Sequence, residues 1–185
     1  MIKHLGLAAA GASLLLAGPS FAALQPGAVA PEFSASGFKG GAPIHFDLKA
    51  ALRKGPVVLY FFPAPETAGC DLEAHLFADA TDKFHSEGAT VIGVTAGNLD
   101  KLALFSKETD HCSGKFPVAA DPTLAISRSY DATLDMPNAP KWSNRTSYVI
   151  APDDKILLAY SNLNPNDHVE KTLAAVEAWR AKHPK

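Results

Sequence analysis

Residues 57–70 read VVLYFFPAPETAGC and combine three local signals. The first six residues are β-branched or aromatic with no polar alternation, which is typical of a strand covered on both faces. Two prolines and a glycine then interrupt the pattern and indicate a loop. From Cys70 to Ser86 apolar residues recur at helical spacing, so we expect a helix whose buried face carries Leu72, Leu76, Ala80 and Phe84.

The segments on either side alternate between strand and helix patterns. Glycines punctuate short apolar stretches in residues 31–46 and predict a small leading hairpin. Further along we expect, in chain order, strand 90–95, helix 99–109, strand 116–120, helix 122–130, a Pro-rich loop at 136–140 and strands 146–150 and 156–160. A short polar link at 151–155 joins the last two strands and indicates an antiparallel pair.

The C-terminal residues predict one more helix, with Asn164 as its cap and Pro165 at its first position. Its buried face is expected to carry Val169, Leu173, Val176 and Trp179. The whole order predicts an α/β fold, a three-layer sandwich with a mixed central sheet, an antiparallel C-terminal hairpin and an N-terminal extension. This is a thioredoxin-like arrangement. Its functional loop is expected at the carboxyl end of a parallel strand, directly after residues 57–62.

The first 22 residues have the pattern of a secretory signal. Lys3 and His4 precede a largely apolar run over residues 5–18, and small residues around Phe21 suit a signal peptidase. The run is shorter than the roughly 20 residues that cross a bilayer. We therefore expect a signal peptide, residues 1–22, cleaved after Ala22. The remainder, residues 23–185, would be one domain that is exported, in a bacterium to the periplasm, and free of the membrane.

Charge and length exclude several classes of partner. The chain has 185 residues and a formal net charge of −2, with no cluster of lysines and arginines. Nothing in this pattern points to nucleic acid or to an anionic membrane surface. About 160 residues also bury an adequate core without covalent staples. The two cysteines, Cys70 and Cys112, are therefore not needed for folding, although a structural disulfide in an exported protein remains the plain alternative.

Cys70 occupies a position that suits a reactive thiol. It falls in the first turn of the predicted helix, where unpaired backbone N–H groups and the helix dipole favour an anion. The thiolate, and not the thiol, is the nucleophile that peroxide chemistry needs. Gly69 lets the backbone come close to a substrate, and the Thr67 hydroxyl can hydrogen-bond to a peroxide oxygen. Thr67 can also cap the helix, which is compatible with that role.

The pattern Pro-x-x-x-Thr-x-x-Cys, from Pro63 to Cys70, resembles the active-site motif of peroxiredoxins. The similarity to the peroxiredoxin Q (bacterioferritin comigratory protein) branch of the alkyl hydroperoxide reductase/thiol-specific antioxidant superfamily extends over almost all of residues 23–185. It is carried by Glu73-Ala74, Val91-Ile92-Gly93-Val94, Phe116-Pro117, Asp121-Pro122, Arg145-Thr146-Ser147-Tyr148-Val149-Ile150 and His168-Val169.

The resemblance implies a thiol-dependent peroxidase and a role for each motif residue. Cys70 would be the peroxidatic cysteine, which attacks a peroxide oxygen and becomes a sulfenic acid. Thr67 and Arg145 would hold the peroxide, and Pro63 would shield the thiolate. Glu73 falls on the predicted core face, where a carboxylate needs a partner, so we expect it to orient Arg145. The alternative is that Glu73 points along the helix edge to water.

Two positions depart from that branch. His75 stands five residues after Cys70, where many members carry a resolving cysteine. Cys112 is then the internal candidate for a resolving thiol, and whether it resolves or is a bystander stays open. Asp71 is the second departure, because its negative charge opposes a neighbouring thiolate.

Other functions on this fold are weaker candidates. A thiol–disulfide oxidoreductase usually needs a Cys-x-x-Cys pair, which this chain lacks. A copper or redox-sensing module would use Cys70 and a histidine, but no paired His or Cys spacing supports a metal site. We therefore expect no cofactor and no metal. The expected partners are a peroxide substrate and a thiol reductant such as a thioredoxin-like protein, and the expected assembly is a monomer or weak dimer.

Overall fold

The computed structural model describes residues 23–135 and 141–184. Its helices and strands are β1 (Ser34–Lys39), β2 (Ala42–Asp47), α1 (Leu48–Leu52), β3 (Val57–Phe61), α2 (Ala68–Ser86), β4 (Thr90–Thr95), η1 (Leu99–Lys101), α3 (Leu102–Lys107), β5 (Val118–Ala120), α4 (Ala125–Ser129), β6 (Thr133–Leu134), β7 (Trp142–Ser143), β8 (Thr146–Ile150), β9 (Ile156–Ser161) and α5 (His168–Lys182). The predicted signal peptide and the predicted loop at 136–140 lie outside the described residues, so both stay predictions.

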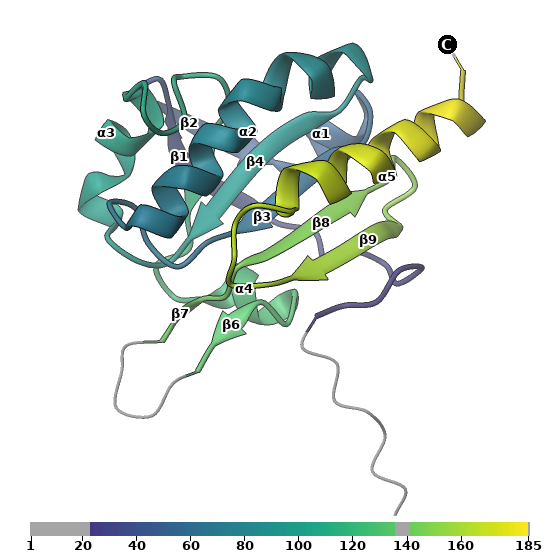
Figure 1. Cartoon of the computed structure of the whole chain (residues 1–185). Helices are drawn as coiled ribbons and strands as arrows, with labels where there is room; N and C mark the ends of the chain where they lie inside the picture. Colours follow the sequence, from purple (N-terminus) through teal and green to yellow (C-terminus); the bar gives the residue numbers. More distant parts are fainter. Residues whose placement is uncertain (1–22, 136–140, 185) are drawn as a thin grey trace, which may run out of the picture.

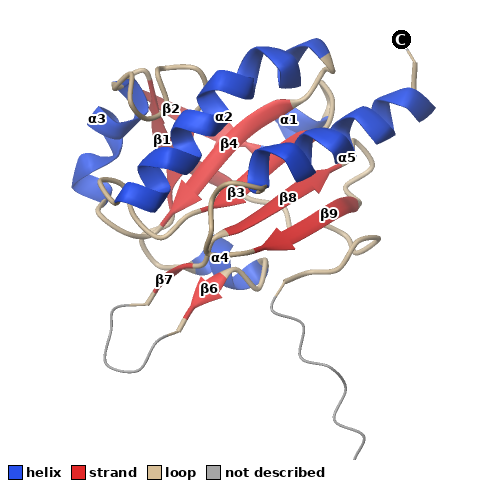
Figure 2. Cartoon of the chain, viewed as in Figure 1, coloured by secondary structure: helices blue, strands red, loops and turns tan. Residues whose placement is uncertain are grey.

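A seven-stranded mixed sheet in the order β2-β1-β5-β4-β3-β8-β9 forms the middle layer. The strands β3, β4 and β5 are parallel, whereas β8 pairs antiparallel with both β3 and β9. Helices α2 and α5 lie side by side across one face (Figures 1 and 2), while α1 and α4 cover the other. The predicted sandwich, its antiparallel C-terminal hairpin and the leading β1–β2 hairpin are confirmed.

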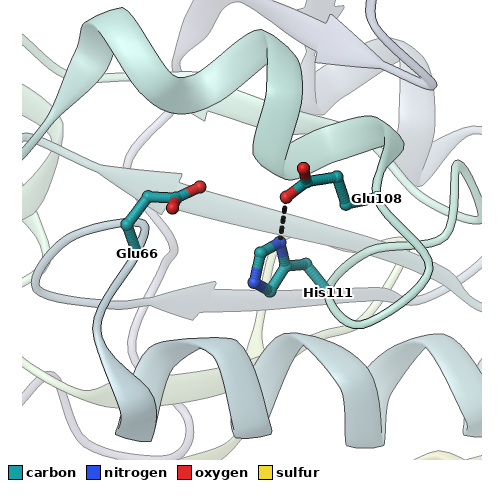
Figure 3. Close-up of side chains that lie close together, drawn as sticks. All are labelled: Glu66, Glu108 and His111. Carbon is teal, nitrogen blue, oxygen red and sulfur yellow. Dashed lines mark ion pairs between the residues drawn. The ribbon is translucent and has the colours of Figure 1, made fainter.

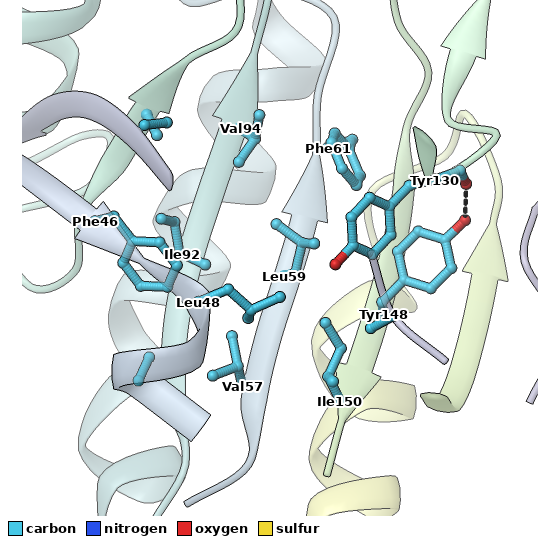
Figure 4. Close-up of a cluster of buried hydrophobic side chains, with 14 of the residues drawn as sticks. Phe46, Leu48, Val57, Leu59, Phe61, Ile92, Val94, Tyr130, Tyr148 and Ile150 are labelled. Carbon is cyan, nitrogen blue, oxygen red and sulfur yellow. Dashed lines mark hydrogen bonds between the residues drawn. The ribbon is translucent and has the colours of Figure 1, made fainter. Parts of the chain in front are cut away.

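The central strand β3 is buried on both faces, which explains its unbroken apolar sequence. All five of its residues are 0% exposed. Side chains of alternate residues enter two separate cores, with Tyr60 facing α2 and Phe61 facing the α1 and α4 side. Figure 4 shows the core on the α1 and α4 side, in which Tyr148 of β8 lies next to Tyr130 at the end of α4. Its labelled members are Phe46, Leu48, Val57, Leu59, Phe61, Ile92, Val94, Tyr130, Tyr148 and Ile150.

The buried face of α2 differs from the predicted one. Leu72 is 42% exposed, and Leu76 and Ala80 are only partly buried. Residues spaced strictly by four advance about 40° around a helix at each step, so they drift away from a fixed face. The observed face mixes steps of three and four, and its members are Cys70, Glu73, Ala74, Phe77, Ala78, Thr81 and Phe84.

The last helix also begins later than predicted. Asn166 and Asp167 form a turn, across which the His168 amide donates to the Pro165 carbonyl at 3.4 Å, and α5 starts at His168. Its fully buried residues are His168, Thr172 and Val176, whereas Val169, Leu173 and Trp179 are only partly buried. His168 is buried because its ring nitrogens have polar partners inside the protein. A search for apolar residues at helical spacing does not detect such a buried residue.

Several short helices and strands were not predicted from the sequence. Helix α1 has five residues and is capped by Asp47, whose carboxylate accepts from the Ala50 amide at 2.6 Å. The two-residue strands β6 and β7 pair with each other beside the main sheet. The predicted helix 99–109 is divided into η1 and α3, and strand 116–120 and helix 122–130 are shorter than expected. Among the described helices, none combines the length and hydropathy of a membrane span.

Candidate active site

The loop between β3 and α2 is held in place by the residues that follow β4. The Thr95 hydroxyl donates to the Pro63 carbonyl at 3.0 Å, and the Asn98 amide donates to the Pro65 carbonyl at 2.9 Å. Gly97 must be a glycine for this approach, since a Cβ there would lie 2.5 Å from the Pro63 oxygen. Two parallel strands therefore fix the loop from both sides at their carboxyl ends, as the sequence predicts.

Cys70 is the third residue of α2 and is 1% exposed. Its amide donates to the Thr67 carbonyl at 2.8 Å. Thr67 is the N-cap, but its side chain makes no capping bond and donates instead to the Ala64 carbonyl at 3.0 Å. With its proton committed in this way, the hydroxyl oxygen of Thr67 is left to accept a hydrogen bond from a ligand.

Arg145 reaches Cys70 from the start of β8 and is 5% exposed. Its Nη2 donates to Cys70 Sγ at 3.4 Å, its Nε donates to the Leu163 carbonyl at 2.9 Å, and its Nη1 donates to Glu73 Oε2. Gly69 makes room for this guanidinium, because a Cβ there would lie 3.1 Å from Nη2. The guanidinium is therefore fixed beside the Cys70 sulfur, in a place where a positive charge can meet negative charge on a reacting atom.

Glu73 is completely buried on the core face of α2. Burial raises the pKa of its carboxyl to about 8, against the opposing effect of Arg145. The two acidic oxygens face different partners, Oε2 toward Arg145 and Oε1 toward His168 Nδ1 at 3.5 Å. Glu73 therefore does not point to water. The structure brings it together with Arg145 and Cys70, as expected from the sequence.

His168 is a member of this cluster that carries part of the family resemblance but to which sequence reasoning assigned no role in the site. It is 0% exposed, with Nδ1 2.8 Å from the Ser147 hydroxyl and Nε2 2.9 Å from the Asn162 carbonyl. Burial lowers the pKa of its ring to about 4. The available signal was the His168-Val169 match to the family, just after the start of a predicted helix.

Comparison with known proteins agrees with the arrangement around Cys70. Residues 26–159 match the sequence profile described as the AhpC/TSA family. The chain belongs to this family. It is 27% identical over 152 residues to the chloroplastic peroxiredoxin Q of Sedum lineare, covering 77% of this chain and 79% of that protein. It is 30% identical over 166 residues to the chloroplastic peroxiredoxin Q of Arabidopsis thaliana, covering 88% and 72%.

A solved structure gives the same result. The peroxidoxin BcpB of Mycobacterium tuberculosis superimposes with a TM-score of 0.72 and 27% identity, over 84% of this chain and 97% of that one. The resemblance predicted from the motif is thus confirmed. Membership of this family and the shared fold make the chain a peroxiredoxin, an enzyme that reduces peroxides at the expense of a thiol.

Cys112 of this peroxiredoxin lies in the turn after α3 and is 0% exposed. It joins Cys70 and Tyr60 in one core cluster, and both cysteines are free thiols in this structure. Burial raises the pKa of the Cys112 thiol well above its usual value, against the opposing effect of the Tyr60 hydroxyl. Cys70 and Cys112 therefore do not form a structural disulfide in this structure.

A group of charged side chains lies on the surface next to the peroxiredoxin motif (Figure 3). Glu66, Glu108 and His111 have ligand atoms within 4.8 Å of one another, and His111 Nδ1 pairs with Glu108 Oε2 at 3.0 Å. The other ring nitrogen of His111 lies 3.6 Å from Asp71, so a protonated His111 would offset the acidic neighbour of Cys70. These residues could hold a cation, but Glu66 is exposed and the group already forms its own ion pairs, so we assign no metal to it.

Proposed function

We propose that this peroxiredoxin reduces hydrogen peroxide and organic hydroperoxides through a sulfenic acid at Cys70. The observation that supports this most directly is the donation from Arg145 Nη2 to Cys70 Sγ at 3.4 Å. A guanidinium in that place both favours the thiolate and is positioned for negative charge on a departing oxygen.

The proposed step uses groups that are already oriented. The Cys70 thiolate attacks one peroxide oxygen, an S–O bond forms and the O–O bond breaks. Sulfur supplies the electron pair, and the second oxygen leaves as hydroxide or alkoxide, which takes a proton from solvent. The oxygen of Thr67 accepts a hydrogen bond from the peroxide, and Arg145 stabilises the leaving oxygen. Pro63, at the start of this loop, is expected from the family resemblance to shield the sulfur from water.

Return to the thiol needs a second thiol, for which we propose Cys112 followed by a thioredoxin-like reductant. Cys112 lies in the same core cluster as Cys70, which supports this role. Because Cys112 is completely buried and its pKa is raised, we expect the turn around residues 108–115 to open before Cys112 attacks. Formation of the disulfide is therefore expected to be slower than formation of the sulfenic acid.

Intact-mass analysis of the reduced protein after one equivalent of peroxide tests the proposal. A loss of two hydrogens indicates a Cys70–Cys112 disulfide, and a gain of one oxygen indicates a sulfenic acid that awaits an external thiol. Cys112→Ser is the matched control, because it should gain one oxygen. An unchanged mass for the reduced protein would refute the peroxidase mechanism at Cys70.

We also propose that the protein acts outside the cytoplasm, as the leader pattern in residues 1–22 suggests. Expression of the full chain in a Gram-negative bacterium, followed by intact mass of the periplasmic fraction, tests this. The expected product begins at Ala23. A full-length chain retained in the cytoplasm would contradict the proposal.

A further inference from the structure

His168 occupies the back of the site, one layer behind Arg145. Its ring is 0% exposed at the first turn of α5, and the Tyr160 ring packs against it with centroids 4.8 Å apart. Ser147, Asn162 and Glu73 surround its two nitrogens. An imidazole held so completely by polar partners is positioned more strictly than packing of the helix alone would require.

The partners define which nitrogen carries the proton. Nε2 lies 2.9 Å from the Asn162 carbonyl, which can only accept, so Nε2 is protonated. Burial keeps the ring neutral by lowering the pKa of His168 to about 4, and Nδ1 is then an acceptor. The Ser147 hydroxyl donates to Nδ1 at 2.8 Å. Nδ1 also faces Glu73 Oε1, an atom without a hydrogen-bond partner among the described residues.

Two separate routes lead from this ring to the guanidinium of Arg145. The first runs through Glu73, whose Oε1 lies 3.5 Å from His168 Nδ1 without a hydrogen bond and whose Oε2 pairs with Arg145 Nη1. The second runs along the backbone, because His168 holds the Asn162 carbonyl and the next residue, Leu163, accepts from Arg145 Nε. Nη1 and Nε of Arg145 are thus held by residues that lie beside His168 or beside its partner Asn162, and Nη2 donates to Cys70 Sγ.

We propose that His168 is a positioning residue of the peroxidase site, which fixes Arg145 against Cys70 through Glu73 and through the Asn162–Leu163 backbone. This inference rests on the proposed function of Cys70. Without His168 the guanidinium keeps its charge but loses its fixed direction. Because the benefit of a charged donor depends on its geometry, both the thiolate and the departing oxygen are then less well stabilised.

Substitutions of His168 separate the two routes. Gln can reach the Asn162 carbonyl with its amide N–H, Asn places a polar group near the position of Nδ1, and Leu removes both contacts. Thr172→Val is the matched control, since Thr172 lies one turn later on α5, is 0% exposed and bonds to the His168 and Val169 carbonyls of its own helix. It disturbs a buried bond of α5 without touching Arg145.

Two rates are measured on each full-length reduced protein, together with its thermal midpoint. Alkylation of Cys70 by iodoacetamide across pH reports the thiolate, in a Cys112→Ser background, and peroxide consumption reports catalysis. We expect His168→Leu to lose about tenfold or more in both rates at pH 7. The Gln and Asn variants should fall between Leu and wild type, and Thr172→Val should match wild type.

The result that overturns the inference is a His168→Leu protein with both rates within about twofold of wild type, or a Thr172→Val protein that loses as much as His168→Leu. If the Leu variant does not fold, wild-type rates in both the Gln and Asn variants overturn it equally. Failure of the proposed function is separate, because it would appear as a wild-type protein that is alkylated at Cys70 but does not consume peroxide.

Discussion

At the scale of single residues, the site depends on how little freedom the guanidinium of Arg145 has. Each of its three nitrogens has its own partner: Nε donates to Leu163, Nη1 to Glu73 and Nη2 to Cys70. The motif around Cys70 was predictable from sequence because its members are close together in the chain. The carbonyl of Leu163 was not, since any residue supplies a carbonyl and only the fold decides which one is aimed at Arg145.

Gly69→Ala tests how closely the guanidinium is seated. Alanine in place of a helical glycine normally stabilises a protein by about 0.5–1 kcal/mol. Here the new methyl would lie 3.1 Å from Arg145 Nη2 and would push the guanidinium away from Cys70. We expect a rate of peroxide consumption about tenfold lower, with a thermal midpoint no lower than that of wild type. A variant with the wild-type rate would mean that this contact is not critical.

At the scale of the elements, β3 and α2 form the frame on which the site is built. The strand was predictable because its burial on both faces leaves a continuous apolar run. The helix was predictable in its extent but not in its orientation, since the exposed Leu72 suggested an apolar face that packing does not use. Glu73 and Cys70 share the true face with Phe77, whose ring stacks on Tyr60 at 4.5 Å between centroids.

Gly93→Ala tests the packing beneath that helix. Gly93 of β4 lies next to Tyr60 of β3, and a Cβ at Gly93 would be 2.8 Å from the tyrosine ring. The ring is fully buried against Phe77 and has no room to withdraw. We expect a loss of about 2 kcal/mol in the free energy of unfolding, measured by urea denaturation. Wild-type stability would show that the Tyr60 ring can move after all.

At the scale of the whole molecule, the site joins segments that are far apart in the chain. The first turn of α2 supplies Cys70, the residue before β8 supplies Arg145, and α5 supplies His168. Sequence reasoning could place the first two through the motif and the fold class. It noted the third only as part of the family resemblance, because the sequence around a histidine does not reveal which buried groups the ring contacts.

The buried Glu73–His168 pair gives the molecule a distinctive pH dependence. When folded, the pair holds one proton between about pH 4 and 8, on Glu73, because the pKa of Glu73 is raised to about 8 and that of His168 is lowered to about 4. In the unfolded chain the pKa values are the ordinary 4.5 for Glu73 and 6.5 for His168. The two groups then hold one proton between pH 4.5 and pH 6.5, on the histidine, and none above pH 6.5. The pair therefore adds no slope to stability from pH 6.5 to 4.5, while from 8 to 6.5 it stabilises the fold as pH falls.

Glu73→Gln removes this balance. The folded variant has no carboxyl proton to retain, so below pH 6.5 only the unfolded chain gains a proton, on its histidine. Stability should then fall as pH decreases from 6.5 toward 4, by up to about 3 kcal/mol relative to wild type. Urea denaturation of both proteins at pH 7 and pH 5 measures the difference. Equal changes in the two proteins would mean that the pair does not share its proton in this way.

The most direct test of the account is the second-order rate constant for hydrogen peroxide, measured by stopped flow on reduced wild type, Arg145→Lys and Cys112→Ser. Lysine cannot make the three directed contacts of the guanidinium, so we predict a rate about a hundredfold lower for Arg145→Lys. Cys112→Ser should react at the wild-type rate, since Cys112 acts only after the first step. A wild-type rate for Arg145→Lys would contradict the claim that a fixed guanidinium beside Cys70 makes this site a peroxidase.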